Sequence, residues 1–259
     1  MDATSSDGTA RTPSTAVVTG GSRGIGRAVV ERLADRGHLV AFCYARDGDA
    51  ARDVEQAVAD RGGLARAVKA DVARAQDVER LFTEAESFFT DHGAPGRPDV
   101  VVANAGITAS APLAEAAEEE FDRVMAANAK GTFLTLRQAA RRMGEGGRVV
   151  AVTSATTFWP GPGEGAYAAG KAACELLARV ASRELGPRGI TVNSVAPGPT
   201  DTDLLRGAVP EEGRSAVAAM TPLGRLGGPG DVADAVVVLA SPEAGWLTGQ
   251  TVRADGGLV

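Results

Sequence analysis

The hydrophobic pattern alternates between two periods along the chain. Short apolar runs, typical of buried strands, separate longer segments in which apolar residues recur every three or four positions, typical of helices that face a core. Strands are expected at residues 16–19, 39–44, 64–70, 100–103, 148–153, 190–195 and 250–253. Helices are expected at residues 25–35, around 54–58, around 78–85, and at 118–143, 167–185 and 231–240. Regular alternation of strands and helices predicts βαβ units and a parallel sheet.

Two polar segments interrupt this rhythm. Residues 1–13 lack the apolar stretch of a signal peptide, and we expect a disordered N-terminal tail there. Residues 199–228 are rich in proline and glycine and follow a predicted strand, so we expect a substrate loop in this region. Residues 14–259, with this loop included, are expected to form a single dinucleotide-binding catalytic domain.

Composition narrows the class of protein. The chain has 259 residues, of which 44% are hydrophobic, enough for one sizeable α/β core. The net charge of −6, with no basic block, argues against a nucleic-acid partner. No apolar run approaches the roughly 20 residues of a membrane span, so no membrane partner is expected. The two cysteines, Cys43 and Cys174, suit a reducing, cytoplasmic location, and we expect no metal site.

The first candidate chemistry lies between residues 154 and 171. Ser154 directly follows a predicted buried strand, at the sheet edge where open α/β proteins bind ligands. Lys171 follows Tyr167 by one helical turn, and a cation at that distance favours the phenolate form of the tyrosine. Together these groups could polarise a carbonyl and give it a proton. That is half of a ketone reduction, and the other half is a hydride.

A glycine turn near the N-terminus fits a nucleotide that carries hydride. Gly20, Gly24 and Gly26 lie between a predicted strand and a helix, where glycine lets the backbone approach a pyrophosphate closely. The spacing GxxxGxG differs from the GxGxxG fingerprint, so the alternative of a plain glycine turn stays open.

The end of the second strand bears on which nucleotide is bound. A carboxylate there would select NAD, whereas this chain has Tyr44, with Arg46 close by and Arg23 in the glycine turn. Two guanidinium groups suit a 2′-phosphate and predict NADPH. Two alternatives remain: Arg46 is a solvated loop residue, or Asp47 and Asp49 pair with the arginines.

These residues, with further motifs in the same order, resemble the short-chain dehydrogenase/reductase family. The motifs are TGGSRGIG at 19–26, ANAG at 103–106, Asn128, Ser154, Tyr167 with Lys171, and Pro197-Gly198. The resemblance covers about residues 15–259 and is nearest to 3-oxoacyl-[acyl-carrier-protein] reductases and related ketoreductases. It implies a single doubly wound, Rossmann-type α/β domain with a mostly seven-stranded parallel sheet and helices on both faces.

The resemblance also implies roles for individual residues. Tyr167 would be the general acid, Ser154 would bind the substrate oxygen, Lys171 would hold the nicotinamide ribose, and Asn128 would hold a proton-relay water. Together with Tyr44 and Arg46, the implied cofactor contacts are Gly20, Ser22, Arg23, Gly24, Ile25, Gly26, Asp71, Val72, Asn104, Ala105, Gly106, Tyr167, Lys171, Pro197, Gly198, Thr200 and Thr202. Trp159 either lines the substrate pocket or packs under its loop. Ala103 stands where the family usually has Asn, and we expect a small effect.

The function expected is NADPH-dependent reduction of a ketone, such as a 3-oxoacyl or polyketide-like carbonyl, to a secondary alcohol. The alternative is an NAD-dependent secondary alcohol dehydrogenase that works in the oxidative direction. A rival of another class is a cofactor-binding sensor without turnover. The resemblance further implies a homotetramer.

Overall fold

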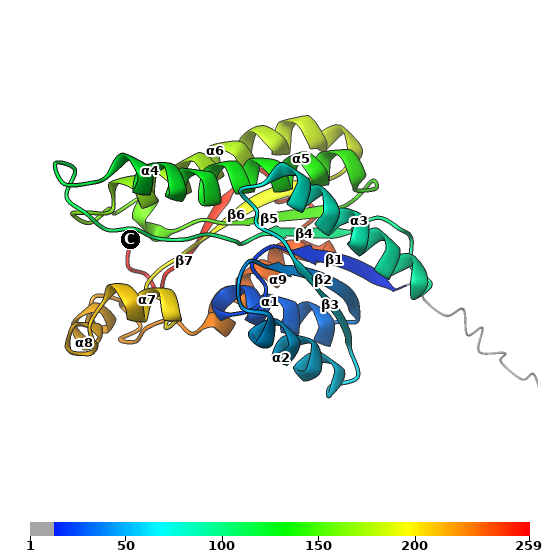
Figure 1. Ribbon diagram of the computed structural model, residues 1–259, viewed down its shortest axis with the longest axis horizontal. Helices are drawn as coiled ribbons and strands as arrows, with labels where there is room; N and C mark the ends of the chain where they lie inside the picture. The colour runs from blue at the N-terminus through cyan, green and yellow to red at the C-terminus, as the bar shows by residue number, and fades with distance from the viewer. Residues whose placement is uncertain (1–12) are drawn as a thin grey trace, which may run out of the picture.

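The computed structural model describes residues 13–259, so the predicted tail lies, apart from Pro13, outside the described residues. Its centre is a seven-stranded parallel sheet with the order β3-β2-β1-β4-β5-β6-β7 (Figure 1). The strands are β1 (Ser14–Val18), β2 (His38–Tyr44), β3 (Leu64–Lys69), β4 (Val100–Ala103), β5 (Arg148–Val152), β6 (Thr191–Pro197) and β7 (Thr251–Ala254). The predicted single doubly wound domain is thereby confirmed.

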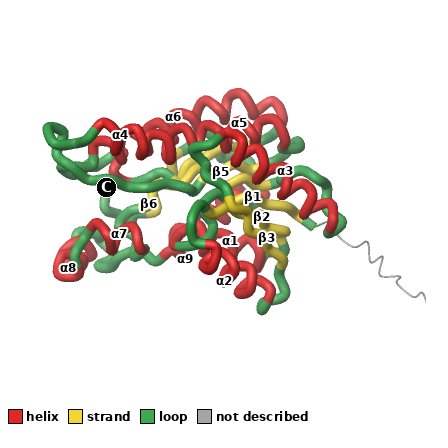
Figure 2. Tube along the Cα trace, in the orientation of Figure 1, coloured by secondary structure: helices red, strands yellow, loops and turns green. Residues whose placement is uncertain are grey.

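Helices cover both faces of the sheet, in three layers (Figures 1 and 2). The helices of one face are α3 (Ala75–Asp91), α4 (Glu118–Met125), α5 (Gly131–Arg142) and α6 (Gly165–Leu185). The other face is covered by α1 (Gly24–Asp35), α2 (Gly48–Ala59) and α9 (Pro229–Ala240). Because both faces are covered, the central strands are apolar on both sides instead of alternating. Successive residues of β1 show this, since Val17 packs into one core and Val18 into the other.

The expected strands and helices all form, with ends shifted by a few residues. The largest difference lies in the helix expected at 118–143. Here α4 and α5 are joined by a π-helical turn, Ala126–Lys130, in which the Gly131 amide donates to the Ala126 carbonyl five residues back. Such turns add one residue to a helix and often mark functional sites.

The segment expected as a loop at 199–228 contains two helices, α7 (Asp203–Ala208) and α8 (Glu211–Ala219). They project from the sheet edge near the C-terminus (Figure 1). Thr202 caps α7 by accepting from the Leu205 amide at 3.4 Å. At the far end of the segment, the Arg225 ion pair and the Gly228 amide lower the pKa of Asp231 to about 2. The segment is therefore fastened at both ends.

Strand order reverses between β1 and β4, which opens a crevice at the carboxyl ends of these strands. The loops that follow β1, β4, β5 and β6 carry the glycine turn, Asn104, Ser154 and Gly198, respectively. The fold therefore brings most of the predicted site residues to one edge of the sheet.

Candidate active site

Helix α6 and strand β5 together position the predicted proton-transfer groups. Lys171 is buried, and its ammonium donates a 2.8 Å hydrogen bond to the carbonyl of Val152, the last residue of β5. The Lys171 Nζ atom lies 6.0 Å from the centroid of the Tyr167 ring, one turn earlier on α6. Ser154 begins the turn that follows β5, and its hydroxyl accepts from the Thr156 amide at 3.3 Å. The structure therefore places Ser154, Tyr167 and Lys171 where β5 meets α6.

Asn128 lies in the π-helical turn and is fully buried. Its side-chain oxygen accepts from the Ile107 amide at 2.8 Å, and its side-chain nitrogen donates to the Ile107 carbonyl at 2.9 Å. A Cβ atom at Gly106 would lie 3.1 Å from Asn128 Oδ1 and 3.2 Å from Lys171 Nζ. The Asn128 side chain thus fixes the loop after β4 against Lys171, and this tight approach leaves little room for a side chain at position 106.

The glycine turn after β1 has the shape that a pyrophosphate requires. Gly20 and Gly24 have φ angles of +68° and +54°, which favour glycine. A Cβ atom at Gly26 would overlap the Gly20 carbonyl oxygen. Helix α1 has no side-chain cap at its start and no acidic residue in its first turn. A dinucleotide fits this cradle, since its phosphates would bind the first amides of α1, which no side chain caps.

Thr19 and Asn104 hold the glycine turn against β4. The Asn104 side-chain nitrogen donates to the carbonyls of Thr19 and Gly20, at 3.0 and 3.1 Å. In return, the buried Thr19 hydroxyl accepts from the amides of Asn104 and Ala105, at 3.0 and 3.1 Å. Thr19 was not predicted as a site residue, although a threonine next to the glycines, at the end of an apolar strand, was a usable signal. None of these four bonds involves the side chain at position 103, where this chain has Ala in place of the family's usual Asn.

The loop after β6, which carries the predicted cofactor contacts Gly198, Thr200 and Thr202, lies against the glycine turn. A Cβ atom at Gly24 would lie 3.3 Å from the Thr202 methyl group, so the two loops are in contact. The Thr200 hydroxyl donates to the Gly198 carbonyl at 2.9 Å. A Cβ atom at Gly198 would lie 2.6 Å from the Cα of Asp255, which explains the glycine at this position.

Two further predicted residues lie on other parts of the site. Val72 is buried at the start of the loop after β3, where a Cβ atom at Gly131 would lie 2.8 Å from its methyl group. Trp159 follows the Ser154 turn and is 49% exposed, with its amide donating to the Ala155 carbonyl. Trp159 is therefore half-exposed, and its place in the substrate pocket stays a prediction.

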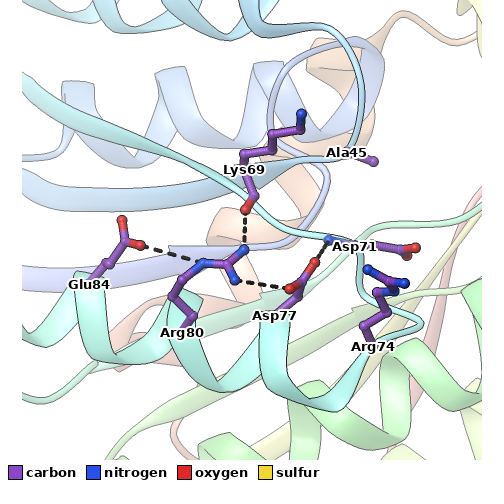
Figure 3. Close-up of a pocket in the computed structure, with 7 residues that line it drawn as sticks. All are labelled: Ala45, Lys69, Asp71, Arg74, Asp77, Arg80 and Glu84. Atoms are coloured by element: carbon purple, nitrogen blue, oxygen red, sulfur yellow. Dashed lines mark hydrogen bonds and ion pairs between the residues drawn. The ribbon is translucent and has the colours of Figure 1, made fainter.

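A pocket of about 440 Å³ opens at the carboxyl ends of β2 and β3 (Figure 3). Its lining residues are Ala45, Lys69, Asp71, Arg74, Asp77, Arg80 and Glu84. Arg80 is committed to Asp77 and to the Lys69 carbonyl, at 3.0 and 2.6 Å. The hydrogen bond from the Asp71 amide lowers the pKa of the Asp77 carboxyl, and Arg80 lowers it further. The side chains of Lys69 and Arg74 make no ion pair with any residue from 13 to 259.

The arginines expected to select NADPH differ from one another. The Arg23 guanidinium pairs with the Asp47 carboxylate at 2.8 Å, which is one of the alternatives left open by the sequence. Asp49 pairs with Arg52 instead. Arg46 is exposed and has no ion-pair partner in the described part of the chain. Free positive charge at this edge therefore comes from Arg46, Lys69 and Arg74, and the sequence analysis had identified only Arg46.

Comparison with known proteins identifies the family. Residues 20–259 match the family described as "Enoyl-(Acyl carrier protein) reductase". A short-chain type dehydrogenase/reductase of Picea abies is 41% identical, over 94% of this chain and 92% of its own length. This chain belongs to the short-chain dehydrogenase/reductase family.

Other members of the family indicate the range of activity. A (3R)-3-hydroxyacyl-CoA dehydrogenase of Mus musculus is 40% identical, over 94% of this chain and 95% of its own length. The crystal structure of an angucycline C-6 ketoreductase with bound NADP has a TM-score of 0.90 and 41% identity, covering 95% of this chain and 96% of that one. This short-chain dehydrogenase/reductase is thus an oxidoreductase whose relatives include both ketoreductases and hydroxyacyl-CoA dehydrogenases.

The described residues also bear on metal binding, membrane insertion and cysteine reactivity. Between residues 13 and 259, no group of three or more His, Cys, Asp or Glu residues could hold a metal ion. No helix in the same range is long and apolar enough to cross a membrane. Both cysteines are free and buried, and burial raises the pKa of the Cys43 thiol to about 11, which keeps it protonated and unreactive.

Proposed function

We propose that this enzyme reduces a ketone to a secondary alcohol with NADPH. The observation that supports this best is the meeting of Ser154, Tyr167 and Lys171 at the end of β5, at the same sheet edge as the glycine cradle. The bound nicotinamide would supply the hydride to the carbonyl carbon. The protein's own task is then to deliver one proton to the carbonyl oxygen.

Each of the three side chains has one part in that proton transfer. The Tyr167 hydroxyl donates its proton to the substrate oxygen, while the Ser154 hydroxyl donates a hydrogen bond that orients the same oxygen. The Lys171 ammonium, held by the Val152 carbonyl at 2.8 Å, stabilises the phenolate that remains on Tyr167. A proton from solvent then restores the phenol, and the product leaves as the alcohol. Asn128 keeps the loop beside Lys171 in place.

NADPH is proposed as the cofactor because free cations gather at the end of β2. Tyr44 and Lys69 are paired in register between β2 and β3, and Arg46 follows two residues after Tyr44. A 2′-phosphate bound here would meet Arg46 and Lys69, with no carboxylate at position 44 to repel it. The NADP bound to the angucycline ketoreductase supports the same choice.

The test is a substrate panel followed by NADPH absorbance at 340 nm. The panel contains a 3-oxoacyl thioester, a polycyclic aromatic ketone and simple cyclic ketones, each assayed also with NADH. Reduction of at least one ketone, faster with NADPH than with NADH at equal concentration, is the expected result. Binding of NADPH without turnover of any ketone or alcohol would favour a sensor role instead.

The oxidative alternative is favoured by one observation. Asp47 lies beside Arg23 and neutralises it, which reduces the positive charge available to a 2′-phosphate. A higher kcat/KM for an alcohol with NAD than for the ketone with NADPH would make this enzyme an NAD-dependent dehydrogenase; the hydroxyacyl-CoA relative is likewise named a dehydrogenase.

We also propose that the enzyme is a homotetramer. Helices α4, α5 and α6 leave large apolar side chains at the surface, namely Phe121, Phe133, Leu176 and Val180. Burying such a face between identical subunits would remove it from water. Light scattering at micromolar concentration measures the mass directly, and the 26.3 kDa mass of one chain would contradict this proposal.

A further inference from the structure

A hydrogen bond outside the four predicted catalytic residues joins the Ser154 turn to helix α6. The Thr157 hydroxyl lies 2.6 Å from Glu175 Oε1. Thr157 comes three residues after Ser154, and Glu175 comes four residues after Lys171, one helical turn further along α6. Both side chains are half-buried. Neither residue was predicted from the sequence to have a role.

The Thr157 hydroxyl has one hydrogen and two acceptors within reach. The other acceptor is the Ser154 carbonyl, at 2.9 Å. A short O–H···O contact to a carboxylate is the stronger of the two bonds, so the hydrogen points to Glu175. The Ser154 carbonyl is not left unpaired, because the Thr157 amide also donates to it at 3.2 Å.

Two bonds from one face of α6 therefore hold the chain on either side of Ser154. Lys171 holds the Val152 carbonyl, two residues before Ser154, and Glu175 holds Thr157, three residues after it. Between Thr157 and α6 the chain runs through residues 158–164, of which 158–162 are exposed. The Ala111 amide holds the far end of this segment by donating to the Gly163 carbonyl at 3.0 Å, whereas the Glu175 bond holds the end next to Ser154.

We propose that Glu175 and Thr157 are positioning residues that set the Ser154 hydroxyl at its working distance from Tyr167. This inference rests on the proposed function, in which both hydroxyls contact one substrate oxygen. Reaction rates are sensitive to such placement, and a misplacement of about 1 Å can cost on the order of 10²-fold. In this role the two residues act through Ser154, so their loss slows catalysis without abolishing it.

The experiment uses five variants: Glu175→Ala, Thr157→Val, the double variant that combines these two changes, Glu175→Gln and the control Glu184→Ala. Glu184 is exposed on the same helix and has no ion pair within the described residues. We expect Glu175→Ala and Thr157→Val each to lower kcat by roughly tenfold, with the Kd for NADPH unchanged. The double variant should lose no more than either single one. Glu175→Gln should recover most of the rate, because its amide oxygen still accepts from Thr157.

A second measurement does not depend on turnover. The chain has two tryptophans, Trp159 and Trp246, so a Trp246→Phe background leaves Trp159 as the reporter of the Ser154 segment. Trp246 is fully exposed, and its replacement disturbs no packing. Acrylamide quenching of Trp159 should rise in Glu175→Ala and stay at the parental value in Glu175→Gln and Glu184→Ala.

These measurements separate the inference from the proposed function. Unchanged kcat together with unchanged quenching in Glu175→Ala would overturn the positioning role, even with the ketoreductase activity established. A loss of thermal stability and of NADPH binding in proportion to the loss of rate would overturn it too, since that pattern indicates a structural role only. Failure of the wild-type enzyme to reduce any ketone would count against the proposed function, and the quenching measurement would still decide whether the bond holds the segment.

Discussion

The two ends of the proposed cofactor site are built on different principles. At the catalytic end, Lys171 and Asn128 are buried, and each is bonded to backbone atoms of a neighbouring element. At the adenosine end, Arg23, Arg46, Lys69 and Arg74 are surface cations, and where they are paired, their partners are other surface side chains. The catalytic end therefore depends on the fold, and the adenosine end depends on a few exchangeable charges.

This difference predicts how the two ends respond to mutation. A buried group bonded to backbone cannot move without leaving its partner unsatisfied, so a substitution there has a large effect. An exposed ion pair contributes only about 0–1 kcal/mol, so a substitution at the adenosine end should change which nucleotide binds while leaving the fold intact.

The largest effect is expected from Tyr167→Phe at the catalytic end. Only the hydroxyl is lost, so turnover should fall by about 10²–10⁴-fold while NADPH still binds. Single-turnover kinetics and a Kd for NADPH measure the two separately. A kcat near that of the wild type would mean that another group donates the proton.

Lys171→Ala should have the next largest effect. It removes the cation that favours the Tyr167 phenolate and leaves the Val152 carbonyl without its donor. We expect weaker cofactor binding and an altered pH profile of the residual activity, because the phenolate left after proton donation then has no neighbouring cation. A pH–rate profile shows this, and an unchanged profile with unchanged affinity would reduce Lys171 to a structural lysine.

At the adenosine end, Tyr44→Asp combined with Arg46→Ala should reverse the nucleotide preference. The wild type should prefer NADPH over NADH by at least about tenfold, since hydrogen bonds to charged groups contribute about 1.5–3 kcal/mol. The double variant adds a carboxylate that repels a 2′-phosphate and removes a cation that attracts it. Kd values for both nucleotides at one ionic strength test this. Equal affinities in the wild type would favour the alternative function, an NAD-dependent alcohol dehydrogenase, over the NADPH-dependent ketoreductase.

The smallest effect is expected from Asp47→Asn. This change frees Arg23 from its ion pair yet keeps the cap on α2, because an asparagine oxygen can still accept from the Ala50 amide. The affinity for NADPH should rise by about two- to fivefold, in line with an exposed pair of at most about 1 kcal/mol. The urea midpoint should stay the same. A weaker affinity for NADPH would show that Asp47 orients Arg23 toward the phosphate instead of competing for it.

The contrast between the two ends also explains what the sequence could predict. Strand and helix order follow from hydrophobic period, and the meeting of Ser154, Tyr167 and Lys171 follows from strand ends and helical spacing. The pairing of Arg23 with Asp47, and the arrival of Lys69 from β3 beside Tyr44, depend on the register between strands, which local patterns do not contain. The helices α7 and α8 were not predicted, because the proline and glycine content of their segment indicated a loop. The Thr157–Glu175 bond joins residues 18 positions apart, and the sequence around neither residue predicts it.

The π-helical turn at Ala126–Lys130 sets how α4 is rotated relative to α5 about the helix axis. The position of Asn128 in the site depends on this rotation. Removing a single residue there would restore a regular α-helix from α4 to α5, with a better internal hydrogen-bond ladder. It would also rotate one half against the other by about 100°, the angle that each residue occupies in an α-helix. Asn128 would then turn away from Ile107, and the loop beside Lys171 would lose both of its bonds. A deletion at this point would therefore favour the helix and at the same time disrupt the active site.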